Sequence, residues 1–118
     1  HLYQLSVRNN DPGNFIESSC TAMFAYGIDA ALHLGLVSDS SYSNSVALAY
    51  RGLRNYSVVP IADGYLTTKN ICKATCIGNK NYYFHRGVQQ GKAYGLASFI
   101  QFGLSYETEK GWRAEGTK

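Results

Sequence analysis

Apolar residues recur at helical spacing in three segments of the chain, 15–34, 42–55 and 92–107. The first and third segments are apolar on most sides, which is typical of buried helices, whereas the second has one apolar stripe typical of a surface helix. In the first segment the repeating positions are Ile16, Cys20, Met23, Phe24, Ile28, Ala31 and Leu32. The pattern therefore predicts an all-α fold with three main helices.

The ends of these helices carry recognisable capping residues. Asp11-Pro12-Gly13 is a turn sequence, and Asn14 lies three residues before Glu17, as in a capping box. Gly35 follows the first helix as a C-cap, and Asp39 or Ser40 can cap the second. We therefore expect Glu17 to reach back to the backbone N–H of Asn14.

Residues 57–91 lack helical periodicity. Two short apolar runs on either side of a turn at 62–64 predict a β-hairpin, and a long glycine-punctuated loop follows it. Long loops without their own structure are often functional. The polar tail, 108–118, is expected to be frayed.

Two helices that are apolar on most sides cannot be covered by one further helix in a chain of 118 residues. We therefore expect residues 1–118 to form a single partial domain, which packs into a larger polypeptide or assembles as a homo-oligomer through its helices.

Composition and charge narrow the function classes. Hydrophobic residues make up 45% of the chain and charged residues 16%, and the net charge of +3 comes from basic and acidic residues without long runs. This distribution argues against nucleic-acid binding, and the absence of a long apolar run argues against a membrane span. The ten tyrosines suit carbohydrate stacking, an extensive interface or ordinary packing.

The odd count of three cysteines, Cys20, Cys72 and Cys76, argues against a disulfide framework of the small secreted type. The three histidines lie far from them and from one another, so no metal site is predicted. Whether Cys72 and Cys76 are bonded is left open.

The segment 11–26, DPGNFIESSCTAMFAY, resembles a signature of the unsaturated rhamnogalacturonyl and glucuronyl hydrolases, glycoside hydrolase families 105 and 88. The likeness continues in order through most of the chain. It is carried by Leu2-Tyr3-Gln4, Leu34-Gly35-Leu36, Ala49-Tyr50-Arg51-Gly52-Leu53, Gly64-Tyr65-Leu66, Ile71-Cys72, Cys76-Ile77-Gly78, Tyr82-Tyr83 and Lys92-Ala93-Tyr94-Gly95.

The resemblance implies that the chain is the C-terminal portion of an (α/α)6 toroid of the six-hairpin type. It also implies hydration of the 4,5 double bond of an unsaturated uronyl oligosaccharide by an aspartate, without a metal or organic cofactor. That aspartate lies upstream in the family, and none of the four aspartates here matches its motif. The chain also has Gln89-Gln90 where the family often carries an asparagine-aspartate pair.

No catalytic residue is identified among the residues present, although Glu17 and His85 are candidates. Hydroxyls near a helix N-terminus can bind a carboxylate, tyrosines can stack on sugars, and basic side chains can pair with a uronate. The substrate-binding candidates are Ser18, Ser19, Thr21, Tyr82, Tyr83, Arg86 and Lys92. Each also has a simpler interpretation as a packing or surface residue.

The leading hypothesis is a segment of a bacterial polysaccharide-degrading glycosidase that lines one side of the substrate pocket. The alternatives are a non-catalytic carbohydrate-binding module and a structural helical module that assembles through apolar helix faces. The resemblance is to bacterial enzymes, and the residues do not distinguish cytoplasm from periplasm.

Overall fold

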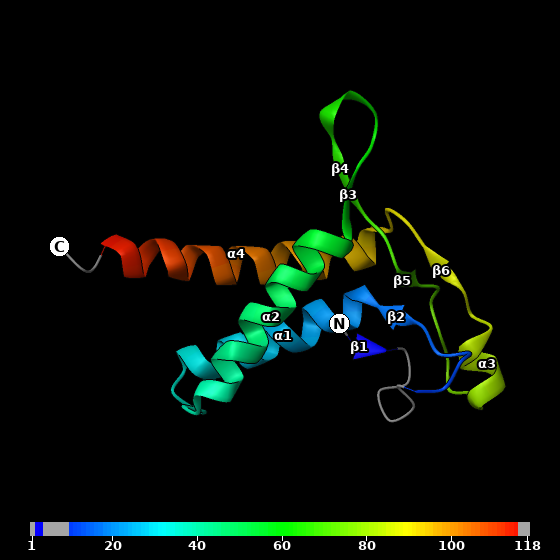
Figure 1. Cartoon of the computed structure of the whole chain (residues 1–118), viewed down its shortest axis with the longest axis horizontal. Helices are drawn as coiled ribbons and strands as arrows, with labels where there is room; N and C mark the ends of the chain where they lie inside the picture. Colours follow the sequence, from blue (N-terminus) through cyan, green and yellow to red (C-terminus); the bar gives the residue numbers. More distant parts are fainter. Residues whose placement is uncertain (1, 4–9, 116–118) are drawn as a thin grey trace.

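The computed structural model describes residues 2–3 and 10–115, with side-chain surroundings for residues 10–108. The described part is mostly helical (Figure 1). The long helices are α1 (Ser18–His33), α2 (Ser40–Tyr56) and α4 (Ala93–Glu115), and α3 (Lys80–Phe84) is a short helix within the long loop. A 3-10 turn, η2 (Ala62–Gly64), lies at a hairpin tip.

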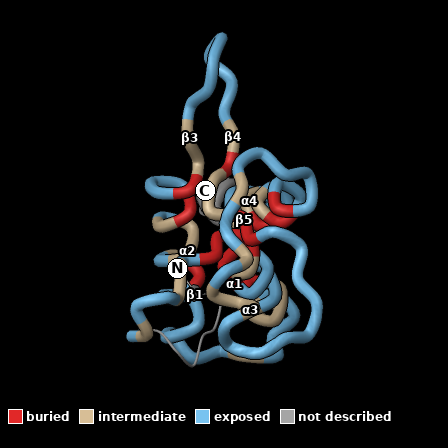
Figure 2. The backbone as a smooth tube through the Cα atoms, turned by 90° about the vertical axis from the view of Figure 1, so that its right-hand side faces the viewer, coloured by how far each residue is buried: buried red, intermediate tan, exposed pale blue. Residues whose placement is uncertain are grey.

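The core lies where α1 packs against both α2 and α4. Its buried apolar side chains are Ala22, Ala25, Val46, Leu53 and Phe102. Figure 2 shows that buried residues gather in this centre, whereas the outer helix faces and loops are exposed. The small alanines of α1 allow α2 and α4 to approach it closely, so α1 lies at the centre of the core.

The three predicted long helices are confirmed, but two of their ends differ. The helix predicted from Phe15 begins at Ser18, because Ile16 and Glu17 are extended and pair with another strand. The last helix continues to Glu115 and includes most of the segment expected to be a frayed tail. The mostly polar sequence of this segment therefore does not end the helix.

The predicted caps at Gly35 and Asp39 are confirmed. Gly35 has a φ of 67°, and its N–H donates to Leu32, while the N–H of Leu36 donates to Ala31. This is the pair of bonds of a Schellman motif, and it needs the left-handed conformation that glycine tolerates. Asp39 accepts from the N–H of Ser41 at 2.7 Å at the start of α2.

In the described part of the chain, three small antiparallel ladders join the loops. The predicted hairpin is formed by β3 (Val58–Pro60) and β4 (Leu66–Thr68), and it projects from the helices (Figure 1). Sequence reasoning missed the pairing of β1 (Leu2–Tyr3) with β2 (Ile16–Glu17) and of β5 (Ile71–Cys72) with β6 (Val88–Gln89). The all-α prediction is therefore correct for the helical body and incomplete for the loops.

Large apolar side chains of α1 and α4 lie on the surface. Met23 and Phe24 are 55% and 63% exposed, and Ile100 and Leu104 are 52% and 64% exposed. The prediction of two helices apolar on most sides agrees with these exposures, but the buried face of α1 is the small-residue face rather than the stripe that contains Met23 and Phe24. The radius of gyration, 15.6 Å, exceeds the ~13.5 Å typical of a compact domain of this length.

None of the helices in the described part of the chain has both the length and the hydropathy that a membrane span requires.

Candidate functional site: the loops at the start of α1

Glu17 is the central polar side chain at the N-terminal end of α1. It is itself the N-cap residue, and its carboxylate accepts from the N–H groups of Ser19 at 3.3 Å and Cys20 at 2.5 Å. It also accepts from the Ser19 hydroxyl at 2.7 Å and from the N–H of Cys72 at 2.9 Å. The carboxylate is therefore bound by four donors from α1 and β5.

This arrangement corrects the predicted capping box. Asn14 does not cap α1, because its side-chain oxygen accepts from the adjacent N–H of Phe15 at 3.1 Å. Glu17 is only 3% exposed, and both carboxylate oxygens accept hydrogen bonds from within the chain. A general acid must reach a substrate atom, so this geometry favours a structural role for Glu17 over a catalytic one.

The hydroxyl residues of α1 face the interior of the chain. Ser18 is fully buried, and its hydroxyl lies 2.7 Å from that of Ser57, next to the hairpin. Thr21 is also buried and donates to the carbonyl of Glu17 at 2.9 Å. Together with Ser19, these residues form the small face on which α1 packs, and their role in substrate binding stays a prediction.

The tyrosine pair of the long loop shapes the loop itself. Tyr82 and Tyr83 belong to α3, and their rings meet edge to face with centroids 5.4 Å apart. The Tyr82 hydroxyl accepts from the N–H of Cys76 at 3.0 Å, and the Tyr83 hydroxyl accepts from the N–H of Gly78 at 3.3 Å. Each hydroxyl thus links α3 to the loop residues that precede it. Both tyrosine side chains are partly exposed.

His85 and Arg86 follow α3. The Nδ1 atom of His85 lies 2.8 Å from the carbonyl oxygen of Asn81. Because a carbonyl only accepts, Nδ1 carries the proton, and Nε2 of the exposed ring is left for an external partner. Arg86 donates to the carbonyl of Ala74, and its guanidinium lies 5.2 Å from the centroid of the Tyr82 ring. These contacts hold a cation beside an aromatic ring at the loop surface.

The turn that precedes α1 is bound to the same loop. Lys80 forms an ion pair with Asp11 at 2.7 Å and lies 5.1 Å from the ring centroid of Phe84. The Phe84 ring packs so closely on Gly13 that an added Cβ would lie 2.4 Å from a ring carbon. Residues about seventy positions apart therefore form one loop cluster, which we define as 11–14 and 71–91.

Lys92 is exposed and immediately precedes α4, where its carbonyl accepts from the N–H of Leu96 at 2.9 Å. Tyr94, the second residue of α4, donates to the carbonyl of Cys72 at 2.9 Å. The structure thus places the loop cluster, the start of α4 and the start of α1 on one side of the molecule (Figure 1). Of the predicted site residues, Tyr82, Tyr83, His85, Arg86 and Lys92 reach this surface.

The three thiols are free. Burial and the Glu17 carboxylate raise the pKa of Cys20 to about 12, and burial and Glu17 also raise the pKa of Cys72. Neither of these two thiols therefore supplies a thiolate nucleophile at neutral pH. Within the described residues no three histidine, cysteine or carboxylate side chains are grouped to hold a metal ion.

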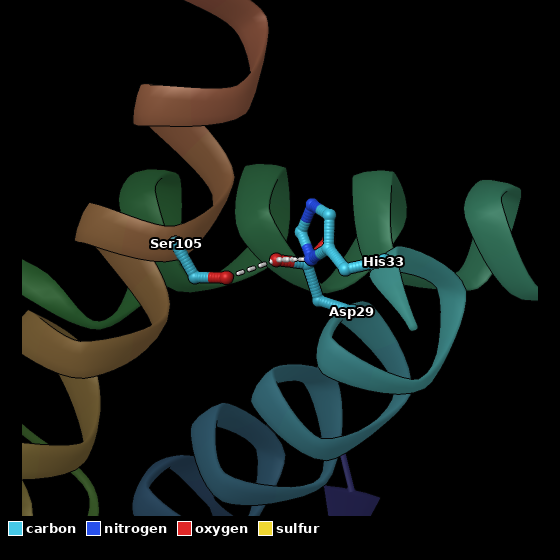
Figure 3. A network of polar contacts seen from close by, with 3 residues as sticks. All are labelled: Asp29, His33 and Ser105. Atoms are coloured by element: carbon cyan, nitrogen blue, oxygen red, sulfur yellow. Dashed lines mark hydrogen bonds and ion pairs between the residues drawn. The ribbon is translucent and has the colours of Figure 1, made fainter. Parts of the chain in front are cut away.

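A second polar network, which sequence reasoning missed, links α1 to α4 (Figure 3). The Ser105 hydroxyl donates to the buried carboxylate of Asp29 at 2.5 Å, and His33 Nδ1 lies 4.0 Å from the same oxygen. These are the residue types of a hydrolase triad, but the serine contacts the aspartate rather than the histidine. In a triad the imidazole takes the proton of the serine hydroxyl, whereas here the hydroxyl donates to the carboxylate and links α4 to α1.

The chain is similar to known proteins of the glycoside hydrolase class. Residues 2–110 match the model of Glycosyl Hydrolase Family 88. The chain is also similar to the solved structure of a family 105 glycoside hydrolase from C. acetobutylicum ATCC 824, with 26% identity and a TM-score of 0.80. That match covers 91% of this chain but 31% of the other, so the chain spans about a third of that hydrolase.

Proposed function

Because this chain belongs to glycosyl hydrolase family 88, we propose that it is the C-terminal part of a hydrolase acting on 4,5-unsaturated uronyl oligosaccharides. In this proposal the helices complete an (α/α)6 toroid, and the loop cluster lines one side of the substrate pocket. The protein would serve in bacterial polysaccharide degradation.

The loop cluster is the observation that carries the proposal. It holds the partly exposed rings of Tyr82 and Tyr83 beside Arg86, and the exposed His85 follows them. Partly exposed aromatic rings next to a guanidinium suit a sugar that bears a carboxylate. The hydrogen bonds and the ion pair that hold this loop would reduce the conformational entropy lost when a sugar binds.

The catalytic acid is proposed to lie outside this chain. Asp11 is paired with Lys80, Asp29 is buried with Ser105, and Asp39 caps α2. The fourth aspartate, Asp63, occupies a left-handed position in the tip of the projecting hairpin, with a φ of 61°. Each aspartate has a structural explanation, and this supports the proposal that the proton for the vinyl ether comes from another part of the protein.

The exposed apolar faces of α1 and α4 support the proposal that further protein surface packs against this chain. Met23, Phe24, Ile100 and Leu104 would be covered by further helices of the toroid. They equally favour the second candidate function, a non-catalytic binding or structural module that assembles as a homo-oligomer. The two differ in carbohydrate binding, because a structural module would leave a uronyl sugar unbound.

We would test the proposal by titrating the chain with an unsaturated rhamnogalacturonan disaccharide and recording backbone amide chemical shifts. The expected shifts lie in the loop cluster, and Arg86→Ala should weaken binding more than the matched surface change Arg51→Ala. Saturable shifts that are confined to α2, or no shifts at all, would overturn the assignment of this site. A size measurement by light scattering would then test the module alternative.

A further inference from the structure

A pocket of about 400 Å³ lies between the last turns of α2, the β3–β4 hairpin and the part of α4 between Leu96 and Glu107 (Figure 1). None of the described residues that line it belongs to the loop cluster, so it is separate from the proposed sugar site. Pockets of this size hold small organic molecules. The walls are mostly apolar, and they include Leu53, Val58, Leu66, Leu96, Phe99 and Phe102.

The hydroxyl of Thr68 lacks the partner that a buried polar group normally has. Thr68 lines the pocket and is only 3% exposed, but its Oγ1 atom has no hydrogen-bond partner among the described residues. Its carbonyl, by contrast, accepts from the N–H of Gly91 at 2.8 Å. Most buried hydroxyls are hydrogen-bonded, because leaving one unpaired costs free energy. A molecule in the pocket that carries a hydroxyl or carbonyl group would supply the missing partner.

Gly103 keeps one wall of the pocket open. It lies inside α4, where glycine destabilises a helix relative to alanine. It is not one of the described glycines with a positive φ, and a Cβ atom added to it would meet no atom within 4 Å. Neither backbone conformation nor packing among the described residues therefore requires a glycine here. A larger side chain would extend into the pocket that Gly103 lines.

The edge of the pocket carries both signs of charge. Arg54 and Glu107 line it and are exposed, and Glu107 accepts a hydrogen bond from the Tyr50 hydroxyl. An anionic ligand would meet Glu107 and a cationic ligand would meet Arg54, so the charges favour a neutral molecule. The rings of Tyr50 and Phe102 meet edge to face with centroids 6.2 Å apart, and a further aromatic ring suits such a wall.

We propose that this pocket binds a neutral molecule with an aromatic ring and one hydrogen-bonding group, such as a phenol. The ring packs against Phe99 and Phe102, and its hydroxyl pairs with Thr68. Binding also covers the side chains of Leu66 and Ile100, which are 67% and 52% exposed. The inference goes beyond the proposed function, because it needs neither the loop cluster nor a uronyl sugar.

The first test combines two probes with one variant of the same side-chain shape. 4-Methylphenol and toluene differ by a hydroxyl, and Thr68→Val removes the hydroxyl of the protein. In titrations of the chain followed by amide chemical shifts, Thr68→Val should weaken binding of 4-methylphenol about threefold to tenfold, through the loss of one hydrogen bond. Binding of toluene should stay within about twofold, because toluene makes no such bond.

The free Thr68→Val variant should also have a Tm about 4 °C higher than the unaltered chain, because it no longer buries an unpaired hydroxyl. Equal losses for the two probes, or no saturable binding of 4-methylphenol, would overturn the proposal. An unchanged or lower Tm would overturn it too, since the Thr68 hydroxyl would then already have a partner.

A second pair of variants tests where the probes bind. Gly103→Leu places a side chain in the pocket and should weaken both probes at least about tenfold. Gly27→Leu is the matched control, because it adds the same side chain to open space on the exposed part of α1; it should leave both affinities within about twofold. Unchanged binding by Gly103→Leu would place the probes elsewhere and contradict the proposal.

Two further results would show a different occupant and overturn the proposal. Tighter binding of 4-methylbenzoate than of 4-methylphenol would make the ligand an anion recognised by Arg54. Self-association of the unaltered chain in light scattering, together with a monomeric Gly103→Leu variant, would make a second copy of the chain the occupant.

Discussion

Replacing Glu17 with alanine should destabilise the chain more than any other single change at the start of α1. The substitution removes the N-cap, which costs about 1 kcal/mol, and leaves the buried N–H of Cys72 without its acceptor, which costs about 1–3 kcal/mol. The sum, about 2–4 kcal/mol, is a large part of the 5–15 kcal/mol typical of a folded domain.

The measurement is thermal and urea unfolding followed by circular dichroism. For a domain of this size, about 4 °C of Tm is lost per kcal/mol, so Glu17→Ala should lower the Tm by about 8–16 °C. Asp39→Ala is the matched control, because it removes an exposed N-cap carboxylate that bonds one N–H within its own helix. The control should have the smaller effect.

Glu17→Gln keeps the fold measurable if the alanine variant fails to fold. Its amide oxygen can still accept from Cys72, but its NH2 group would face the N–H of Cys20, so the stability loss should lie between those of the two alanine variants. Hydrogen exchange at the Cys72 amide should also accelerate. If Glu17→Ala proves no more destabilising than Asp39→Ala, the carboxylate does not tie β5 to α1 and the reasoning is refuted.

Other substitutions test the packing and electrostatics. Gly95→Ala should lower the free energy of unfolding by about 1–3 kcal/mol, because the new Cβ would lie 2.7 Å from side-chain atoms of Ile71. Gly27→Ala meets open space within a helix and should raise the free energy of unfolding by up to ~1 kcal/mol. Urea unfolding of the two variants distinguishes these effects, and equal effects would contradict the packing of Gly95 on Ile71. Because the pKa of Cys20 is raised to about 12, the folded state holds its thiol proton above pH 9, where an unfolded thiol loses it. Stability should therefore fall as pH rises from 9 toward 12, and Cys20→Ala should lessen that fall in pH-dependent unfolding. An unchanged slope would contradict the role of burial and Glu17.

The helices and the β3–β4 hairpin could be predicted because their signals are local. Apolar spacing marked all three long helices, and Gly35 and Asp39 marked two of their ends. The start of α1 could not be placed, because residues 16–17 pair with a strand earlier in the chain and their extended conformation is a tertiary effect. The short β5–β6 ladder has only two residues on each side, too few for a periodic pattern.

The candidate site was predictable in its residue types but not in its arrangement. Tyr82, Arg86 and Lys92 were identified as sugar-binding candidates from their chemistry and from the resemblance to the family. The bond between Glu17 and Cys72 spans 55 positions, and no local spacing predicts it.

The central claim is that this chain supplies part of a uronyl hydrolase pocket while the catalytic acid lies elsewhere. Its most direct test is to incubate the purified chain with an unsaturated rhamnogalacturonan disaccharide and follow the ultraviolet absorbance of the double bond, beside a full-length family 88 enzyme. We expect the full-length enzyme to remove the absorbance, and this chain alone to leave it unchanged while it binds the sugar. Loss of absorbance with the chain alone would contradict the account, because a catalytic acid would then have to be among the 118 residues.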